Sequence, residues 1–315
     1  MKTKLTASAE QAAMFIAKGE CVAFPTETVY GLGANVFDVT AVKKIFEAKG
    51  RPPDNPLIVH IAHDSELALL ARRIPDVAHE FIQKFFPGPL TLVLPKSKFV
   101  PSIVSAGLNS VAIRMPSHSV AQAFLRAAGV SIAAPSANLS GKPSATSWRA
   151  VKEDLDGKIS CILKGDDSPI GLESTVVDCT GKVPLVLRTG AISLEQLQAV
   201  HARTALANPK KTAAPKSPGM KYTHYAPTAA VVLIDSVDEI RRATKKSAYI
   251  GLSMPSPALH FQKICMSLEE YAQSLFSFFR DADAAGVTHI YCECVPEQGI
   301  GRALMDRLRK ASSRL

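Results

Sequence analysis

The stretch CVAFPTETVYGLG, residues 21–33, joins a short apolar run to a polar turn and then to two glycines. Its first four residues predict a short buried strand. Upstream, Ser8 and Gln11 have the spacing of a capping box, which predicts a helix that ends near Gly19. Downstream, residues 41–49 place apolar side chains on one helical face and stop at a glycine. This alternation of helix and strand predicts an α/β fold.

The same alternation continues to about residue 200. Apolar runs predict further strands at residues 57–61, 91–94, 110–114, 131–134, 174–178 and 184–188. Helical periodicity predicts helices at about residues 65–86, 119–128 and 147–155. Some neighbouring strands are joined by loops too short for a crossover helix, so the sheet should be mixed. Residues 1–200 are therefore predicted to form one α/β domain.

Residues 201–227 contain four prolines and lack periodicity, which is typical of a linker. From residue 199 to residue 227 there are five Lys or Arg and no acidic residue. Residues 228–315 then alternate again, with strands predicted at 229–234, 247–252 and 288–295 and helices at 237–244, from Ser267 onward, and at 302–312. This regular alternation predicts a small parallel, Rossmann-like domain.

Composition restricts the class of protein. The chain has 315 residues, which suits two domains, and its formal net charge of +9 favours contact with phosphates of a nucleotide or a nucleic acid. No apolar run approaches the roughly 20 residues of a membrane span, and the first residues do not form a signal-peptide pattern. We expect a cytoplasmic protein. The 6 cysteines lack a C-x-x-C pair and should be reduced and structural.

Standard nucleotide-binding and hydrolase signatures are absent from the sequence. There is no P-loop, Gly31 and Gly33 lack the third glycine of a dinucleotide loop, and neither H-E-x-x-H nor G-x-S-x-G occurs. If the protein binds ATP, individual side chains must hold it.

Polar side chains cluster instead where strands or helices end. Thr26 lies in the turn after the first strand, where its hydroxyl could bind a ligand or close the turn. The segment KGRPPDNPLIVH, residues 49–60, groups two cations and an amide around a double-proline bend. Such a group suits a polyphosphate, but cations also favour a solvated helix end.

Four more polar features lie at the start or end of predicted strands or in a loop after one. Arg114 stands at the polar end of an apolar strand, where it could grip a carboxylate or form a structural salt bridge. The segment APSANLSGKPSAT, residues 134–146, offers neutral donors for phosphate oxygens or is an ordinary surface loop. Ser174 starts a predicted strand and Arg188 ends another.

Read in order, these segments resemble the YrdC family, in the long two-domain form of the threonylcarbamoyl-AMP synthases. The resemblance covers most of residues 10–227, through FPTETVYGLG, KGRPPDNPLIVH, PGPLTLVL, VAIRMP, APSANLSGKPSAT, GLESTVVD and SPGMKYTHYAP. Beyond residue 227 it rests on the layout and on GIGRALMDRLRKAS. It implies a YrdC-like twisted mixed sheet with an open, positively lined cavity.

The resemblance also implies a set of site residues. The family's threonine-binding positions fall on Thr26, His60, Arg114 and Ser174, with Arg114 on the carboxylate. Its ATP-binding positions fall on Lys49, Arg51, Asn55, Ser110, Ser136, Asn138, Ser144 and Arg188. Tyr222 matches a linker residue that reaches back to the nucleotide, which makes the linker a lid. Thr189 departs from the family, which usually has proline there.

The implied reaction joins ATP, L-threonine and bicarbonate into threonylcarbamoyl-AMP and releases pyrophosphate, with Mg²⁺ accompanying ATP. A tRNA threonylcarbamoyl transferase would then use the product to modify adenosine in ANN-decoding tRNAs. His60 could act as a base or only bind, and we assign no general base.

Two rival functions stay open from the sequence. One is a double-stranded RNA or tRNA-binding module without catalysis, since the net charge would also support weak tRNA binding. The other is a carbamoyl-transfer enzyme resembling hydrogenase maturation proteins, but those carry paired-cysteine zinc segments that this chain lacks.

Overall fold

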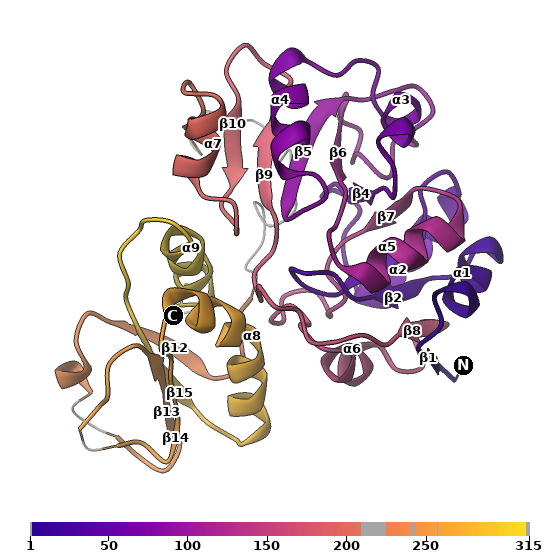
Figure 1. Cartoon of the computed structure of the whole chain (residues 1–315). Helices are drawn as coiled ribbons and strands as arrows, with labels where there is room; N and C mark the ends of the chain where they lie inside the picture. The colour runs from indigo at the N-terminus through magenta and orange to yellow at the C-terminus, as the bar shows by residue number, and fades with distance from the viewer. Residues whose placement is uncertain (1, 209–224, 241–242, 257, 313–315) are drawn as a thin grey trace.

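The computed structural model describes residues 2–208, 225–240, 243–256 and 258–312. Its strands form two separate sheets, and helices pack on each of them (Figure 1). The largest hydrophobic cluster lies within the first 200 residues, and the second largest lies mostly beyond residue 225. No helix among these described residues is long and apolar enough to cross a membrane.

The large sheet is mixed, as the sequence predicts. Its order is β1-β8-β2-β3-β7-β4-β6-β5-β9-β10-β11. The strands are β1 (Lys4–Thr6), β2 (Val22–Phe24), β3 (Gly31–Asn35), β4 (Ile58–His60), β5 (Leu90–Pro95), β6 (Ser110–Arg114), β7 (Ile132–Ala134), β8 (Cys161–Leu163), β9 (Thr175–Asp178), β10 (Leu185–Arg188) and β11 (Ala205–Leu206). For example, β4 pairs with β6 in parallel, whereas β2 pairs with β3 antiparallel.

Four of these strands, β1, β3, β8 and β11, were not predicted. β3 contains two glycines, and Gly33 needs to be glycine because an added Cβ would lie 2.5 Å from Ile132 Cγ2 and 2.9 Å from the Phe24 ring. β11 lies inside the segment predicted as a linker and pairs with β10 in parallel. Strands of two to five residues carry too little periodicity to be detected without their partners.

Helices cover the large sheet. They are α1 (Ala9–Ala17), α2 (Val39–Lys49), α3 (Leu67–Leu70), α4 (Asp76–Phe85), α5 (Ser119–Ala128), α6 (Trp148–Leu155) and α7 (Leu194–Val200). The single helix predicted at 65–86 is wrong: a 3₁₀ turn (Asp64–Glu66) and α3 come first, and α4 begins after Pro75. Ala71 is extended and bridges to Lys96, and Pro75 cannot continue a helix. The helix is therefore interrupted between Leu70 and Asp76.

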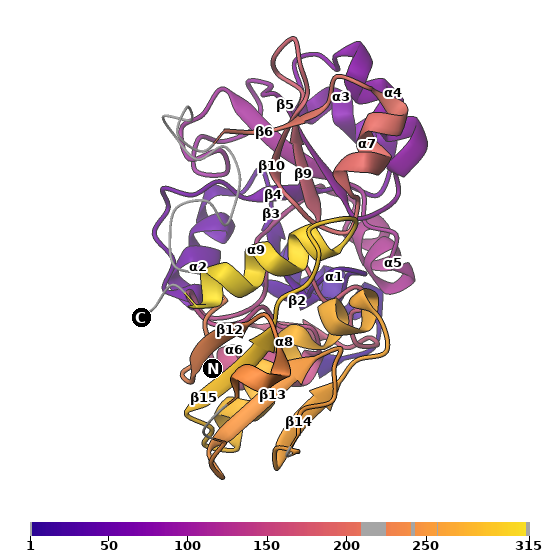
Figure 2. The ribbon, with the colours of Figure 1, turned by 90° about the vertical axis from the view of Figure 1, so that its left-hand side faces the viewer.

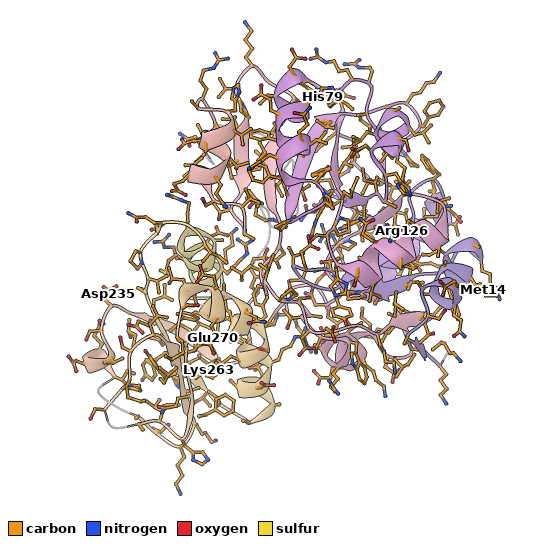
Figure 3. All side chains as sticks on the ribbon, in the orientation of Figure 1. Met14, His79, Arg126, Asp235, Lys263 and Glu270 are labelled. Carbon is orange, nitrogen blue, oxygen red and sulfur yellow. The ribbon has the colours of Figure 1, made fainter. Side chains whose placement is uncertain are left out.

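The small sheet is entirely parallel, in the order β12-β15-β13-β14. Its strands are β12 (Ala230–Ile234), β13 (Ser247–Gly251), β14 (Phe261–Ile264) and β15 (His289–Glu293), and its helices are α8 (Leu268–Ala284) and α9 (Gly301–Ser312). The predicted parallel arrangement is confirmed, although β14 was missed. The helix predicted at 237–244 appears in the described residues only as a 3₁₀ turn, Val237–Glu239. Lys263 on β14 pairs with Glu270 on α8 at 2.5 Å (Figure 3).

The two parts contact each other through α8 and α9. Figure 2 shows α9 lying between the two sheets. Val29 and Leu172 of the first part join the hydrophobic cluster of the second. Gly171 has a φ of +77°, and a Cβ there would lie 2.4 Å from Gln273 Cα on α8. The close backbone approach and the shared apolar cluster hold α8 against the first part of the chain.

Candidate active site

One pocket gathers most of the predicted site residues. It is lined by Thr26, Arg51, His60, Arg114, Ser136, Asn138, Ser144, Ser174 and Arg188, among others. Most of these side chains come from the ends of β2, β4, β6, β7 and β10, from the start of β9 or from the loops beside them, and Arg51 follows α2. The fold therefore brings together segments far apart in sequence. The cavity measures about 60 Å³ and is partly open to solvent.

Four predicted residues are not among the pocket lining. Lys49 and Asn55 are buried close to it, and Ser110 begins β6, the strand that Arg114 ends. Four residues of strand separate Ser110 from Arg114 by about 13 Å. Tyr222 lies outside the described residues.

Arg114 is held by three partners at the end of β6. Its Nε donates to the Gly88 carbonyl at 3.2 Å, and its Nη1 donates to Thr28 Oγ1 at 2.7 Å. Its Nη2 lies 2.6 Å from Glu27 Oε1, and both side chains are buried. Burial alone would raise the pKa of Glu27, but the charge of Arg114 and hydrogen bonds hold that pKa below its usual value. A guanidinium has five N–H groups, so Arg114 keeps donors for a ligand.

Thr26 both lines the pocket and closes its own turn. Its hydroxyl donates to the Val29 carbonyl at 2.6 Å and accepts from the Thr28 and Val29 amides at 3.2 and 3.3 Å. The sequence left open whether this hydroxyl closes the turn or binds a ligand. It closes the turn, and the same contacts place it on the pocket wall.

His60 ends β4 in a dry environment. Its Nδ1 lies 3.2 Å from the Ile58 carbonyl, and its ring meets the edge of Phe24 with centroids 5.7 Å apart. Burial, followed by the nearby charge of Arg114, lowers the pKa of His60 to about 3. His60 is therefore neutral at pH 7 and is a weak base.

Lys49 holds the loop after β7. Its Nζ donates to the Ser136 carbonyl at 2.6 Å and also to the Asn138 carbonyl. Complete burial lowers the pKa of Lys49 well below its usual value. The loop is further tied by Ser136 Oγ, which donates to Asn138 Oδ1 at 2.5 Å, and by Asn138 Nδ2, which donates to the Leu139 and Lys142 carbonyls. Lys49 therefore supports from behind a loop whose serine faces the pocket.

Arg188 and Ser174 form the opposite wall. Arg188 Nε donates to the Ser174 carbonyl at 3.1 Å, and its Nη2 donates to Ser174 Oγ at 3.1 Å. Ser174 Oγ also lies 2.7 Å from Thr91 Oγ1. Its contacts with both Arg188 and Thr91 hold the Ser174 hydroxyl at the start of β9.

Sequence reasoning passed over several pocket residues, namely Thr28, Lys142, Glu173 and Tyr225. Glu173 belongs to the motif GLESTVVD, but an acidic residue is not expected in a pocket that is predicted to bind anions. Tyr225 lies three positions after Tyr222 in the same KYTHYAP segment, and residue type could not choose between two tyrosines.

Tyr225 occupies the pocket in an uncommon backbone conformation, with a φ of 71°. Its ring stacks on Phe276 of α8 with centroids 5.4 Å apart. The guanidinium of Arg307 on α9 lies 5.3 Å from the centre of the same ring. The second part of the chain thus supports one wall of the pocket.

The fold and the site define a two-part α/β protein whose pocket, lined with arginines and hydroxyls, suits a small anionic ligand. A family model described as "Telomere recombination", which groups Sua5, YciO and YrdC, matches residues 14–190. A second model, "Threonylcarbamoyl-AMP synthase, C-terminal domain", matches residues 192–313. The chain belongs to the threonylcarbamoyl-AMP synthase family, and the resemblance predicted from its motifs is confirmed.

Individual relatives agree over nearly the whole chain. The threonylcarbamoyl-AMP synthase of Pyrococcus abyssi is 48% identical over 96% of this chain and 93% of its own length, and that of Bacillus subtilis is 45% identical over 96% and 92%. The crystal structure of P. abyssi Sua5 complexed with L-threonine matches with a TM-score of 0.90 and 46% identity, covering 97% of this chain and 94% of that one. Full-length HypF, at 16% identity and a TM-score of 0.51, shares only the fold, over 58% of this chain.

Proposed function

We propose that the protein is an L-threonylcarbamoyladenylate synthase, a nucleotidyltransferase that converts ATP, L-threonine and bicarbonate into threonylcarbamoyl-AMP and pyrophosphate. The observation that carries the proposal is the arrangement of Arg114, Arg51 and Arg188 around one pocket, which offers separate cations to a carboxylate and to a phosphate chain. Relatives with this activity in their names and a relative crystallised with L-threonine support it.

Threonine would bind at the Arg114 end of the pocket. The N–H groups of Arg114 that Gly88, Thr28 and Glu27 leave over would hold its carboxylate. Thr26 and Ser174 would offer hydroxyl groups, and His60 would act as a neutral hydrogen-bonding partner because its pKa lies far below 7. The internal bonds of these residues are made before the ligand arrives, which lowers the entropy lost on binding.

ATP would bind along Arg51, Arg188 and the loop of residues 134–146, with Ser136, Asn138 and Ser144 beside it and Lys49 supporting the loop. Asn55 adds a further indication, because its amide nitrogen and oxygen are buried without a hydrogen-bond partner in the described structure. Buried polar atoms usually have partners, so a ligand that reaches Asn55 would remove a cost. For Ser110, which lies at the far end of β6, a contact with ATP stays a prediction.

The chemistry would depend mainly on positioning. The amine of threonine attacks the carbon of bicarbonate, water is lost, and a carbamate forms. A carbamate oxygen then attacks the α-phosphorus, and the bond to pyrophosphate breaks. Arg51 and Arg188 would offset charge that gathers on the phosphate oxygens. No general base is assigned, because His60 is too weakly basic at pH 7.

Mg²⁺ would enter as part of the nucleotide substrate. Among the residues that the structure describes, no three His, Cys, Asp or Glu side chains gather as a metal site. The phosphates of ATP supply the oxygen ligands that Mg²⁺ prefers, and the ion commonly keeps several waters.

Outside the pocket, the product would pass to a tRNA threonylcarbamoyl transferase for modification of adenosine in ANN-decoding tRNAs, within the cytoplasm. The net charge of +9 would permit weak contact with tRNA.

Pyrophosphate release measured with each substrate omitted in turn tests the proposal. We expect release only when ATP, L-threonine and bicarbonate are all present. Release that ignores threonine would contradict it. Binding of double-stranded RNA that collapses with added salt, without any pyrophosphate release, would favour the RNA-binding alternative instead.

A further inference from the structure

One arginine of the second part of the chain is completely buried against the first part. Arg307, on α9, has an exposed fraction of 0%. Its Nε donates to Glu173 Oε2 at 2.9 Å, and its Nη2 donates to the Thr189 carbonyl at 2.9 Å. Its Nη1 donates to Asp306 Oδ2 at 2.6 Å on its own helix. Only the backbone of Thr189 is used, so the departure from the family's proline leaves this contact possible.

Glu173 links Arg307 to the pocket. Its other oxygen, Oε1, accepts a hydrogen bond from Ser144 Oγ at 2.5 Å, and both Glu173 and Ser144 line the pocket. Burial alone would raise the pKa of Glu173, but the charges of Arg307 and then Arg188 hold it below its usual value. The carboxylate is therefore ionised and can only accept.

The ionised carboxylate determines which atoms Ser144 offers to a ligand. A serine hydroxyl has one proton and two lone pairs. Since that proton is donated to Glu173, the oxygen of Ser144 presents lone pairs to the pocket. It can then accept from a hydroxyl or amino group of a nucleotide, but it cannot donate to a phosphate oxygen.

Arg307 differs from Arg302, another arginine of α9 that forms an ion pair with the first part of the chain. Arg302 on α9 pairs with Glu195 at 3.2 Å, and both side chains are partly exposed. An exposed pair of that kind contributes little. A fully buried pair costs desolvation that a hydrophobic contact would avoid. The Arg307–Glu173 pair lies against the pocket wall, where its charges act on the site.

We propose that Arg307 is a positioning residue for the synthase reaction, which orients Glu173 so that Ser144 accepts a hydrogen bond from the nucleotide. The inference deepens the proposed function and rests on it. Through this contact the second part of the chain becomes part of the active site, because α9 supplies the cation that the carboxylate in the pocket requires.

Kinetics against pH test the proposal. Activity is measured from about pH 5.5 to about pH 8.5. Arg307→Met keeps the bulk of the side chain but removes its charge, so the pKa of Glu173 should rise into that range. We expect kcat/KM for ATP to fall by about tenfold or more at the acid end and to recover as the pH rises, because a loss of one pKa unit of stabilisation is a factor of ten. Arg307→Lys, which keeps a cation, should shift the acid limb less.

The charged and titratable groups around the Glu173–Arg307 pair come from several elements. They are Arg188 on β10, Asp306 and Lys310 on α9, and Tyr225 before β12, while Arg114 on β6 acts on Arg188. Glu173→Gln isolates the effect of Glu173 from these neighbours, because it removes the titrating group while they remain. The double variant Glu173→Gln with Arg307→Met should match Glu173→Gln alone and show no new acid limb, since residues that act as a unit are not additive.

Arg302→Ala is the matched control on the same helix and should keep the wild-type profile. Thermal unfolding of each variant separates a loss of folding from a loss of positioning. If Arg307→Met does not fold, the test is made with Arg307→Lys and the double variant. A wild-type pH profile in Arg307→Met or a double variant that is additively worse would overturn the inference alone. A wild-type protein that releases no pyrophosphate with all substrates would overturn the proposed function, and the inference with it.

Discussion

Arg114 Nη2 lies 2.6 Å from Glu27 Oε1, and both residues are buried at the end of β6 and in the turn after β2. A buried guanidinium needs such a partner, because an isolated buried charge is very costly. The pair therefore holds Arg114 in place while leaving some of its N–H groups for a ligand. Lys49 beside the pocket, and Arg188 and Ser144 on its wall, are likewise held by partners within the protein.

Arg114→Ala should weaken the binding of threonine while leaving the binding of ATP nearly intact, because the variant loses the partner of the carboxylate and does not touch the phosphates. A charge-assisted hydrogen bond contributes about 1.5–3 kcal/mol, so the Kd for threonine should rise about tenfold to a hundredfold. Calorimetric titration with each ligand measures this. Equal losses for both ligands would contradict the assignment.

Acid stability should depend on the buried carboxylates. The pKa of Glu27 is lowered in the folded state, so its contribution to the free energy of unfolding is complete above the unfolded pKa of about 4.5 and is lost as the pH falls through the folded value. We expect the wild-type free energy of unfolding to drop steadily below about pH 4.5. Glu27→Gln should be less stable at pH 7 and show a shallower drop, measured by urea unfolding at several pH values. A slope equal to that of the wild type would argue against the contribution of Glu27.

Lys49→Met should loosen the loop of residues 134–146 and raise KM for ATP, since the carbonyls of Ser136 and Asn138 lose their shared donor. Two buried carbonyls left without this donor predict an increase of about tenfold or more. Lys43→Ala is the control, because Lys43 is exposed on the same helix and should leave KM unchanged. If both variants behave alike, Lys49 does not support the loop.

His60 should stay neutral well below pH 6. Burial and the charge of Arg114 lower its pKa to about 3, so no ring titration is expected between pH 5 and pH 8. Nuclear magnetic resonance of the imidazole nitrogens checks this directly, with an exposed histidine such as His63 as the internal reference. A midpoint near 6.5 for His60 would show that its environment is wetter than the structure indicates and would reopen a role as general base.

Much of the fold and of the pocket could be predicted from local patterns. Apolar runs located β4, β5, β6 and β9, and motif positions located Thr26, His60, Arg114 and Ser174, which meet because the sheet places the ends of their strands together. Short strands such as β1 and β8 escaped because three residues carry no clear period and depend on pairing with each other across the chain.

The sequence by itself determined the alternation of elements, the parallel second sheet and the family, because these depend on periodicity and on motifs within a few residues. Only the tertiary structure decided which hydrogen-bond donors of the site residues are taken up by partners within the protein. It also decided which acidic residues line the pocket. Glu173 and Arg307 are 134 positions apart, and their contact exists because α9 packs against the first part of the chain. Burial and charge at such a contact are properties of the packed molecule, so no local pattern could reveal them.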